Sequence, residues 1–107
     1  MSFTGNEGSY ITLTQGSAWT ASYRSANPNA TKAHFLGKSK ISEILGQTGC
    51  VGLRMYYAID DNGAKELVIV GVSSNGCDMT SGLLLDRSTP CPPYCDVTSA
   101  LNGSNGG

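Results

Sequence analysis

The chain has 107 residues, a formal net charge of -1 and only 14% charged residues. That length suits one domain with a modest core, and the near-zero charge creates no field that would attract nucleic acid or an acidic membrane. No apolar run approaches the roughly 20 residues that span a bilayer. Residues 1–9 also lack a basic stretch followed by an apolar one, so we expect a soluble cytoplasmic protein.

Both ends of the chain are rich in Gly, Ser and Asn. Segments of this composition bury too little apolar surface to offset the entropy lost on ordering. We therefore expect a flexible N-terminus at residues 1–9 and a flexible tail at residues 102–107. Between them we expect a single α+β domain at residues 10–101.

The first predicted helix begins at Thr12 and ends before Asn27-Pro28. Thr12 and Gln15 have the spacing of a capping box, and the residue before a proline is disfavoured in the α region. Trp19 and Tyr23 lie four residues apart on one face of this helix. Such a pair is more often a core anchor than a platform for a ligand, so we expect it to be buried.

A short strand and a second helix follow. The segment KAHFLG, residues 32–37, alternates and places Ala33 and Phe35 on one face of a strand and His34 on the other. Ser39 can cap a helix that Gly46 or Gly49 would end. The apolar stripe of that helix consists of Ile41, Ile44 and Leu45.

The segment from Cys50 to Ser74 is predicted to form a β-hairpin around which the chain is organised. It holds the densest β-branched and aromatic residues, and Asn62-Gly63 tolerates the positive φ angles of a two-residue type I′ turn. That turn makes a core face by placing three residues of the first strand opposite three valines: Leu53 opposite Val72, Met55 opposite Val70, and Tyr57 opposite Val68. A four-residue loop at Asp60–Gly63 preserves these faces, whereas a three-residue loop would mix them.

The opposite face of the predicted hairpin is half apolar. Arg54 faces Gly71 there, Tyr56 faces Ile69, and Leu67 faces Ala58. Two helices are few for covering both faces of a sheet, so we expect this face to be thinly covered within one copy of the chain. The predicted interface residues are Arg54, Tyr56, Leu67 and Ile69.

The last segments complete the predicted fold. Residues 82–86 form an apolar run that we interpret as a strand, and residues 89–95 form a stiff proline strap, because residues before proline are pushed into extended geometry. The order of elements predicts an α+β fold in which two helices pack on a small, mainly antiparallel sheet built around the central hairpin.

Four of these segments together carry a resemblance: KAHFLG, GCVGLRMYY, LVIVGV and PCPPYC. The chain resembles a family of small bacterial proteins without an established function, over roughly residues 11–101. The resemblance implies one shared fold and a bacterial source. It implies no activity.

The four cysteines are weighed as a metal site and as structural thiols. Cys91 and Cys95 are separated by Pro92-Pro93-Tyr94, and a polyproline II path at ~3.1 Å per residue would hold their α-carbons ~12 Å apart. Zinc ligands must lie much closer together, and no C-x₂-C pair is present. We therefore expect no metal and no cofactor, with the thiols buried or anchoring the strap.

Two other motifs fail on one or two residues each, and one pair of residues stays an alternative. Gly37-Lys38-Ser39 lacks the first glycine of a phosphate-binding loop, because Lys32 occupies its place. Asp60–Gly63 lacks the acidic residues at both ends of a calcium loop. His34 is the only histidine, and Cys50 is its only candidate partner in a catalytic pair.

Two functions from different classes remain. The favoured one is a non-catalytic interaction or self-assembly module whose partner is another copy of the chain or another protein. Such a module would form a homo-oligomer that can extend into a filament. The alternative is a small thiol- or metal-dependent enzyme or binding protein that uses Cys50, His34, Cys91 and Cys95.

Overall fold

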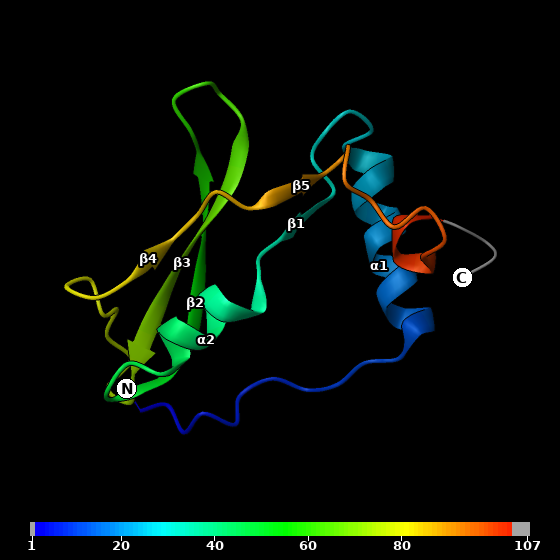
Figure 1. Ribbon diagram of the computed structural model, residues 1–107. Helices are drawn as coiled ribbons and strands as arrows, with labels where there is room; N and C mark the ends of the chain where they lie inside the picture. The colour runs from blue at the N-terminus through cyan, green and yellow to red at the C-terminus, as the bar shows by residue number, and fades with distance from the viewer. Residues whose placement is uncertain (1, 104–107) are drawn as a thin grey trace. The chain divides into compact units, whose positions relative to one another are not determined.

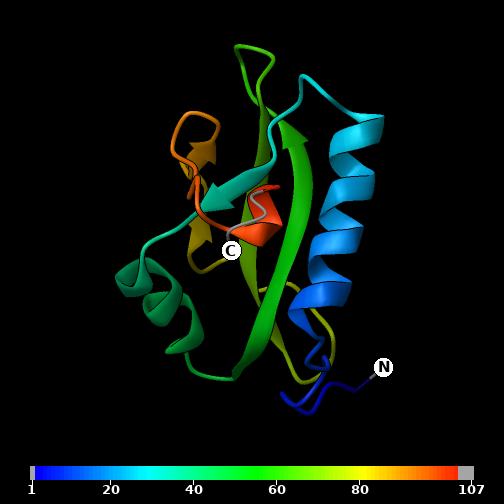
Figure 2. The same cartoon turned by 90° about the vertical axis from the view of Figure 1, so that its right-hand side faces the viewer.

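The computed structural model describes residues 2–103, and the elements are shown in Figures 1 and 2. The contacts divide the chain into two compact units. The first contains the residues up to Gly8 together with Leu36–Ser88, and the second contains Ser9–Phe35 together with the residues from Thr89 onward. The single domain expected at residues 10–101 stays a prediction. The flexibility expected for Met1 and residues 104–107 lies outside the described part of the chain.

The predicted α+β class is confirmed. The described residues form the helices α1 (Leu13–Ala26) and α2 (Lys38–Leu45) and the short 3-10 helix η1 (Ala100–Asn102). The strands are β1 (Ala33–Phe35), β2 (Cys50–Ile59), β3 (Lys65–Ser73), β4 (Leu84–Leu85) and β5 (Thr89–Cys91). They belong to two antiparallel sheets, one of order β2-β3-β4 and one of order β1-β5, whereas the sequence predicted one sheet.

In the first unit α2 packs on one face of the β2-β3-β4 sheet (Figures 1 and 2). Ile44 of α2 is only 1% exposed, and Gly71 of β3 lets it approach, since a β-carbon on Gly71 would lie 3.3 Å from Ile44 Cγ2. Of the predicted apolar stripe, Ile44 therefore forms the buried contact with the sheet, whereas Leu45 is 46% exposed. The core of the unit lies at Ile44, Ile69, Val70 and Val72.

The hairpin is present, but the predicted turn and register are wrong. Gly63 has a φ of +82°, whereas Asn62 stays outside the positive-φ region, so the turn is not type I′. Asp60 and Ala64 close the loop through a bond of 2.9 Å from the Asp60 N–H to the Ala64 carbonyl. The Asp60 carboxylate also accepts from the N–H groups of Asn62 and Ala64, each at 2.9 Å. These side-chain bonds stabilise a three-residue loop, which was the loop expected to mix the two faces.

The register shifts every cross-strand pair by one residue. Leu53 now lies opposite Gly71, Arg54 opposite Val70 and Tyr56 opposite Val68. The two faces predicted for the hairpin are therefore mixed, because side chains alternate along each strand. At its start β2 contains a bulge: Cys50 pairs with Ser73 and Gly52 with Val72, which leaves Val51 as the extra residue.

In the second unit α1 begins as predicted. Thr12 accepts from the Gln15 N–H at 3.1 Å, and the Gln15 side chain accepts from the Thr12 N–H at 3.0 Å, which completes the capping box. Gly16 is the only buried residue of the helix, and a β-carbon there would lie 3.2 Å from Leu101 Cδ2 of η1. The missing side chain at Gly16 allows η1 to pack beside α1 (Figure 1).

The expectation of a buried aromatic anchor on α1 is wrong. Trp19 is 60% exposed and Tyr23 is 41% exposed. The described contacts of α1 concentrate instead on the face that bears Gly16, where η1 packs.

The expected stiff strap at residues 89–95 is also wrong. Thr89–Cys91 forms β5, and the Tyr94 N–H then donates to the Pro90 carbonyl at 3.0 Å, so the chain turns back on itself. The peptide bonds Cys91-Pro92 and Pro92-Pro93 are cis. Cys91 and Cys95 form a disulfide with their α-carbons 4.8 Å apart, far less than an extended path would give.

Candidate functional site

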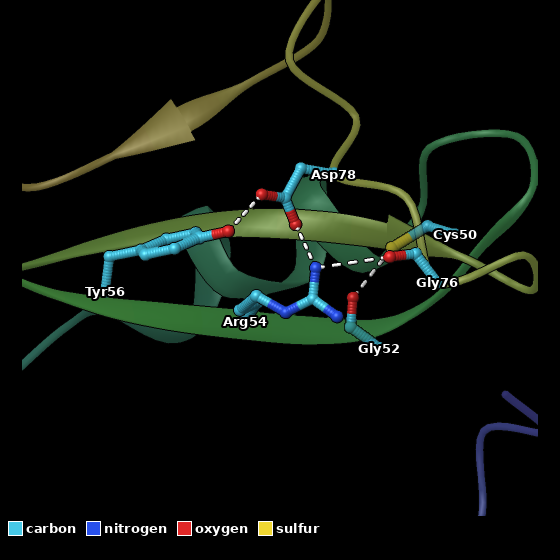
Figure 3. Close-up of polar contacts among 6 residues, drawn as sticks. All are labelled: Cys50, Gly52, Arg54, Tyr56, Gly76 and Asp78. Atoms are coloured by element: carbon cyan, nitrogen blue, oxygen red, sulfur yellow. Dashed lines mark hydrogen bonds and ion pairs between the residues drawn. The ribbon is translucent and has the colours of Figure 1, made fainter. Parts of the chain in front are cut away.

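The first unit contains a polar cluster formed by Arg54, Tyr56 and Asp78, called here the Arg54 cluster (Figure 3). Arg54 and Tyr56 lie two residues apart on β2 and therefore point to the same face of the sheet. Asp78 follows the turn after β3 and is held in position by a bridge to Val72. Figure 3 shows the Asp78 carboxylate between the other two side chains.

The bonds within the Arg54 cluster occupy both oxygens of the carboxylate. Arg54 Nη1 donates to Asp78 Oδ1 at 2.5 Å and to the Gly76 carbonyl at 3.3 Å. The Tyr56 hydroxyl donates to Asp78 Oδ2. These bonds join the three side chains in one polar network, and they fix the loop after β3 against β2.

These bonds shift the ionisation of each member of the cluster. The hydrogen bond from Tyr56, followed by that from Arg54, holds the pKa of Asp78 below its usual value. The bond to Asp78 raises the pKa of Tyr56, and it also raises the pKa of Arg54. At neutral pH the cluster therefore consists of a carboxylate, a neutral phenol and a guanidinium. A carboxylate that already accepts two hydrogen bonds is a poor general base. The cluster therefore stabilises the position of the loop after β3 against β2.

A cavity of about 270 Å³ lies beside the cluster. The Arg54 guanidinium lies 5.7 Å from the centre of the Phe3 ring, and the Phe3 N–H donates to the Ser74 carbonyl at 2.7 Å. The carboxylate of Glu7, which also lines the cavity, accepts from the N–H groups of Thr4 and Gly5, at 2.8 and 2.9 Å. These contacts involve part of the segment expected to be flexible, and that expectation stays a prediction. The lining residues are Phe3, Gly5, Glu7, Val51, Gly52, Leu53, Arg54 and Val72.

The interface residues predicted from the sequence do not form one patch. Arg54 and Tyr56 share a face of the sheet. Leu67 and Ile69 lie on the other face, where their cross-strand partners are Tyr57 and Met55. Ile69 is also only 2% exposed, so it belongs to the core. The reason is the one-residue difference in register between the predicted and the observed hairpin.

The residues of the alternative thiol site are distributed over the two units. Cys50 belongs to the first, where its thiol donates to the Gly52 carbonyl at 3.2 Å, and His34 belongs to the second, opposite Pro90 in the β1-β5 pair. Cys91 and Cys95 are bonded to each other and offer no thiolate. Within residues 2–103 no group of three His, Cys, Asp or Glu side chains is arranged to hold a metal ion.

Sequence reasoning missed the most connected residue of the cluster. Asp78 lies 24 positions after Arg54 and 22 after Tyr56. Nothing local in the sequence links it to either partner, because the link depends on the register of β2 and β3. The signal that could have pointed to it is the Ser74-Asn-Gly76 turn, which returns the chain to the end of β3.

The free edge of β2 is a second candidate surface. β2 pairs only with β3 within the described part of the chain, so its other edge is open. Because Asp60 bonds across the hairpin to Ala64, the even-numbered residues of β2 bond to β3 and the odd-numbered ones point their N–H and C=O groups outward. On β3, Gly71 is the cross-strand partner of Leu53, and its carbonyl accepts from the Met79 N–H on the side away from β2. This bond agrees with the alternation.

The outward-pointing residues are also apolar. They are Leu53, Met55, Tyr57 and Ile59, and this set is called here the β2 edge. Tyr57 is 94% exposed, and Met55 and Ile59 are also exposed. α2 covers the sheet near Ile44 and Gly71, and the half of the strand toward the hairpin loop extends beyond it.

Comparisons with known proteins add no relative. No family model, no curated protein and no solved structure matches the chain. In the described residues, none of the helices has the length and apolar character needed to cross a membrane.

Proposed function

We propose that this chain is a non-catalytic self-assembly module that pairs with a second copy of itself through the β2 edge. The observation that supports the proposal best is the free outer edge of a ten-residue strand, where outward backbone groups and exposed side chains lie at the same positions. An open edge of this kind is a template for adding another strand.

From Leu53 to Ile59 the β2 edge lacks the features that normally prevent strand addition. Protected edges carry prolines, several charges or inward-pointing lysines. β2 contains no proline and a single charged residue, Arg54. The bulge at Val51 lies at the far end of the strand and leaves residues 53–59 regular.

An antiparallel pairing of two β2 strands is self-complementary. If Met55 lies opposite Tyr57 of the second copy, Leu53 lies opposite Ile59, and each outward group meets an outward group. Arg54 then lies opposite Ala58, so like charges are not placed together. A twofold axis through Tyr56 relates the two copies, which closes the assembly at a dimer.

Proline at an outward position tests this pairing directly. Tyr57→Pro removes an N–H that points away from β3, and proline is tolerated on edge strands. We expect Tyr57→Pro to be monomeric and Tyr57→Thr, which keeps the N–H, to remain a dimer. Size-exclusion chromatography with light scattering over a dilution series, with far-UV circular dichroism as a folding control, measures both.

A cross-link tests the register. In a Cys50→Ser, Cys77→Ser background, Tyr56→Cys places one thiol beside the twofold axis at a non-hydrogen-bonded pair, where Cα atoms lie about 4.5 Å apart. We expect oxidation to give a covalent dimer. Ala58→Cys serves as the control, because it lies away from the axis and should give little. A wild-type chain that is monomeric at about 100 µM would overturn the proposal, since it corresponds to a Kd far weaker than micromolar.

The bacterial source and the cytoplasmic location stay proposals. The Cys91–Cys95 disulfide favours an oxidising compartment, because cytosolic thiols are kept reduced. Alkylation of the protein directly on cell lysis, followed by mass measurement, distinguishes the two locations by the number of labelled cysteines.

A further inference from the structure

The second unit exposes two aromatic rings on one face of α1. Trp19 and Tyr23 are four residues apart, so their side chains are neighbours on the helix surface. Both are exposed although each could bury a large apolar area. An exposed aromatic pair beside a cavity is a common feature of ligand-binding surfaces.

A cavity of about 200 Å³ lies against this pair. Its lining consists of Trp19, Thr20, Tyr23, Arg24, Lys32 and Leu101. Two aromatic rings, one leucine, one hydroxyl and two cationic side chains therefore surround the space, and no carboxylate lines it. Such a combination is complementary to a ring that carries a negative charge.

The walls of this cavity are held in place by contacts inside the unit. Arg24 Nη1 donates to the Leu101 carbonyl at 2.7 Å, which fixes the guanidinium between α1 and η1. The Lys32 N–H donates to the Cys91 carbonyl at 2.6 Å, which fixes the backbone of Lys32 at the start of β1. No hydrogen bond or ion pair within the described residues involves the Lys32 ammonium, so it can bind an anion.

We propose that this cavity binds a small planar aromatic anion, meaning one ring system that carries a single phosphate or carboxylate. The ring stacks against Trp19 and Tyr23, and Lys32 binds the anionic group, with Arg24 adding positive potential. A volume of about 200 Å³ is below the usual range for drug-sized ligands, so one ring fits inside and the remainder projects into solvent.

The size and charge of the site disfavour a polymer. Proteins that bind single-stranded nucleic acid combine aromatic residues with a positively charged groove that follows the backbone. Here two cations line one cavity, and the chain as a whole carries a net charge of -1. The proposal is therefore a mononucleotide-sized ligand, and polymer binding is an outcome that would overturn it.

Trp19 is the only tryptophan, so tryptophan fluorescence, excited at a wavelength that tyrosine does not absorb, reports on this site alone. The probes are adenosine 5′-monophosphate, 2-naphthoate, adenosine and ribose 5-phosphate, each corrected for absorption at the exciting wavelength. We expect saturable quenching by at least one of the first two, which also distinguishes a phosphate from a carboxylate ligand. Adenosine lacks the charge and ribose 5-phosphate lacks the ring, so each should bind at least roughly tenfold more weakly.

The matched variants separate the ring from the charge. Lys32→Ala and Tyr23→Ala should each raise the Kd roughly tenfold, which corresponds to the loss of one charge-assisted or stacking contact. Lys38→Ala, in α2 of the first unit, is the control and should leave the Kd unchanged. Trp19→Phe has no tryptophan fluorescence, so its Kd is measured by equilibrium dialysis with the labelled probe. Circular dichroism of each variant excludes a folding defect.

Three results would overturn this inference. They are the absence of saturable quenching up to about 10 mM of either anion, equal binding by adenosine and its monophosphate, and tighter binding of a single-stranded RNA than of the mononucleotide. The Tyr57→Pro variant keeps this test independent of self-assembly. Binding by that monomeric variant with an unchanged Kd would support the site in the second unit whatever the oligomeric state of the chain.

Discussion

Gly71 of β3 lies so close to Gln47 that a β-carbon on the glycine would stand 2.9 Å from Gln47 Nε2 and 3.0 Å from Cys50 Sγ. Gln47 is itself fixed, since its Nε2 donates to the Ile44 carbonyl at 3.0 Å and its Oε1 accepts from the Leu83 N–H at 2.9 Å. The end of α2 and the segment before β4 are therefore joined above a position that has no room for a side chain.

We predict that Gly71→Ala destabilises the protein by about 1–3 kcal/mol, because the added methyl group would overpack a buried contact. Urea unfolding followed by circular dichroism measures the change in the free energy of unfolding. Gly52→Ala is the matched control on the neighbouring strand, since a β-carbon there meets nothing within 4 Å. Equal effects of the two substitutions would contradict the packing described for Gly71.

A second prediction concerns the hairpin loop. Gly63 has a φ of +82°, a conformation in which a β-branched residue is strained. We expect Gly63→Val to destabilise the fold by at least about 1 kcal/mol and Gly63→Asn to cost less, because asparagine tolerates this region. Thermal unfolding monitors both variants, and an unchanged melting temperature for Gly63→Val would refute the loop geometry.

The sequence predicted the hairpin but not its register, and the difference can be traced to one carboxylate. Asn62-Gly63 favours a two-residue turn when the turn is considered alone. Asp60 adds two side-chain bonds to the loop N–H groups of Asn62 and Ala64, and these favour the three-residue loop. A one-residue difference then moves Ile69 into the core and away from the predicted interface.

The bounds of the helices were predicted well because their signals are local, but the predicted cap at Ser39 is wrong, since Ser39 lies inside α2 and the N-cap is Gly37 without a side-chain bond. The Thr12 capping box and the Ile44 stripe each depend on residues within one or two turns. Burial of Trp19 was predicted wrongly, since burial depends on what packs against a helix. Gly16, a residue type that destabilises a helix interior, lies on the packed face of α1, where it contacts Leu101.

The Cys91–Cys95 pair could not be found from the sequence for a related reason. Sequence favours an extended path for each residue before a proline, but the turn at residues 92–94 brings the two cysteines together. We predict that alkylation under denaturing, non-reducing conditions labels two cysteines, Cys50 and Cys77, and that prior reduction exposes all four. Labelling of all four without a reductant would contradict the disulfide.

The disulfide also closes a short loop, so its removal should weaken the fold. The chain-entropy model gives about 2 kcal/mol for a loop of this length. We expect the double variant Cys91→Ser, Cys95→Ser to lose about that amount relative to wild type in urea unfolding. Cys50→Ser, Cys77→Ser is the control for replacing two sulfurs without removing a cross-link. An equal loss in the two double variants would show that the bond itself contributes nothing.

The last prediction concerns acid stability and the Arg54 cluster. Tyr56 and then Arg54 hold the pKa of Asp78 below its usual value in the folded protein. The folded state therefore binds the proton more weakly than the unfolded state, whose aspartate pKa is about 3.9. The resulting stabilisation is present above that value and is lost as the pH falls through the lower folded pKa. Asp78→Asn cannot gain this stabilisation, so its free energy of unfolding should fall less steeply than that of wild type below about pH 5.

Other carboxylates contribute to the same pH range, and the comparison must remove them. Glu7, Asp60 and Asp96 also have lowered pKa values, each through hydrogen bonds from nearby groups, and all three remain in the Asp78→Asn variant. The difference between the wild-type and variant curves therefore isolates Asp78. Asp61→Asn replaces a carboxylate of the hairpin loop that makes no hydrogen bond within the described residues, so it is the control for the substitution of an aspartate by an asparagine. If the curves of Asp78→Asn and wild type ran parallel between pH 5 and pH 3, the bonds of Asp78 to Arg54 and Tyr56 would not stabilise the folded protein.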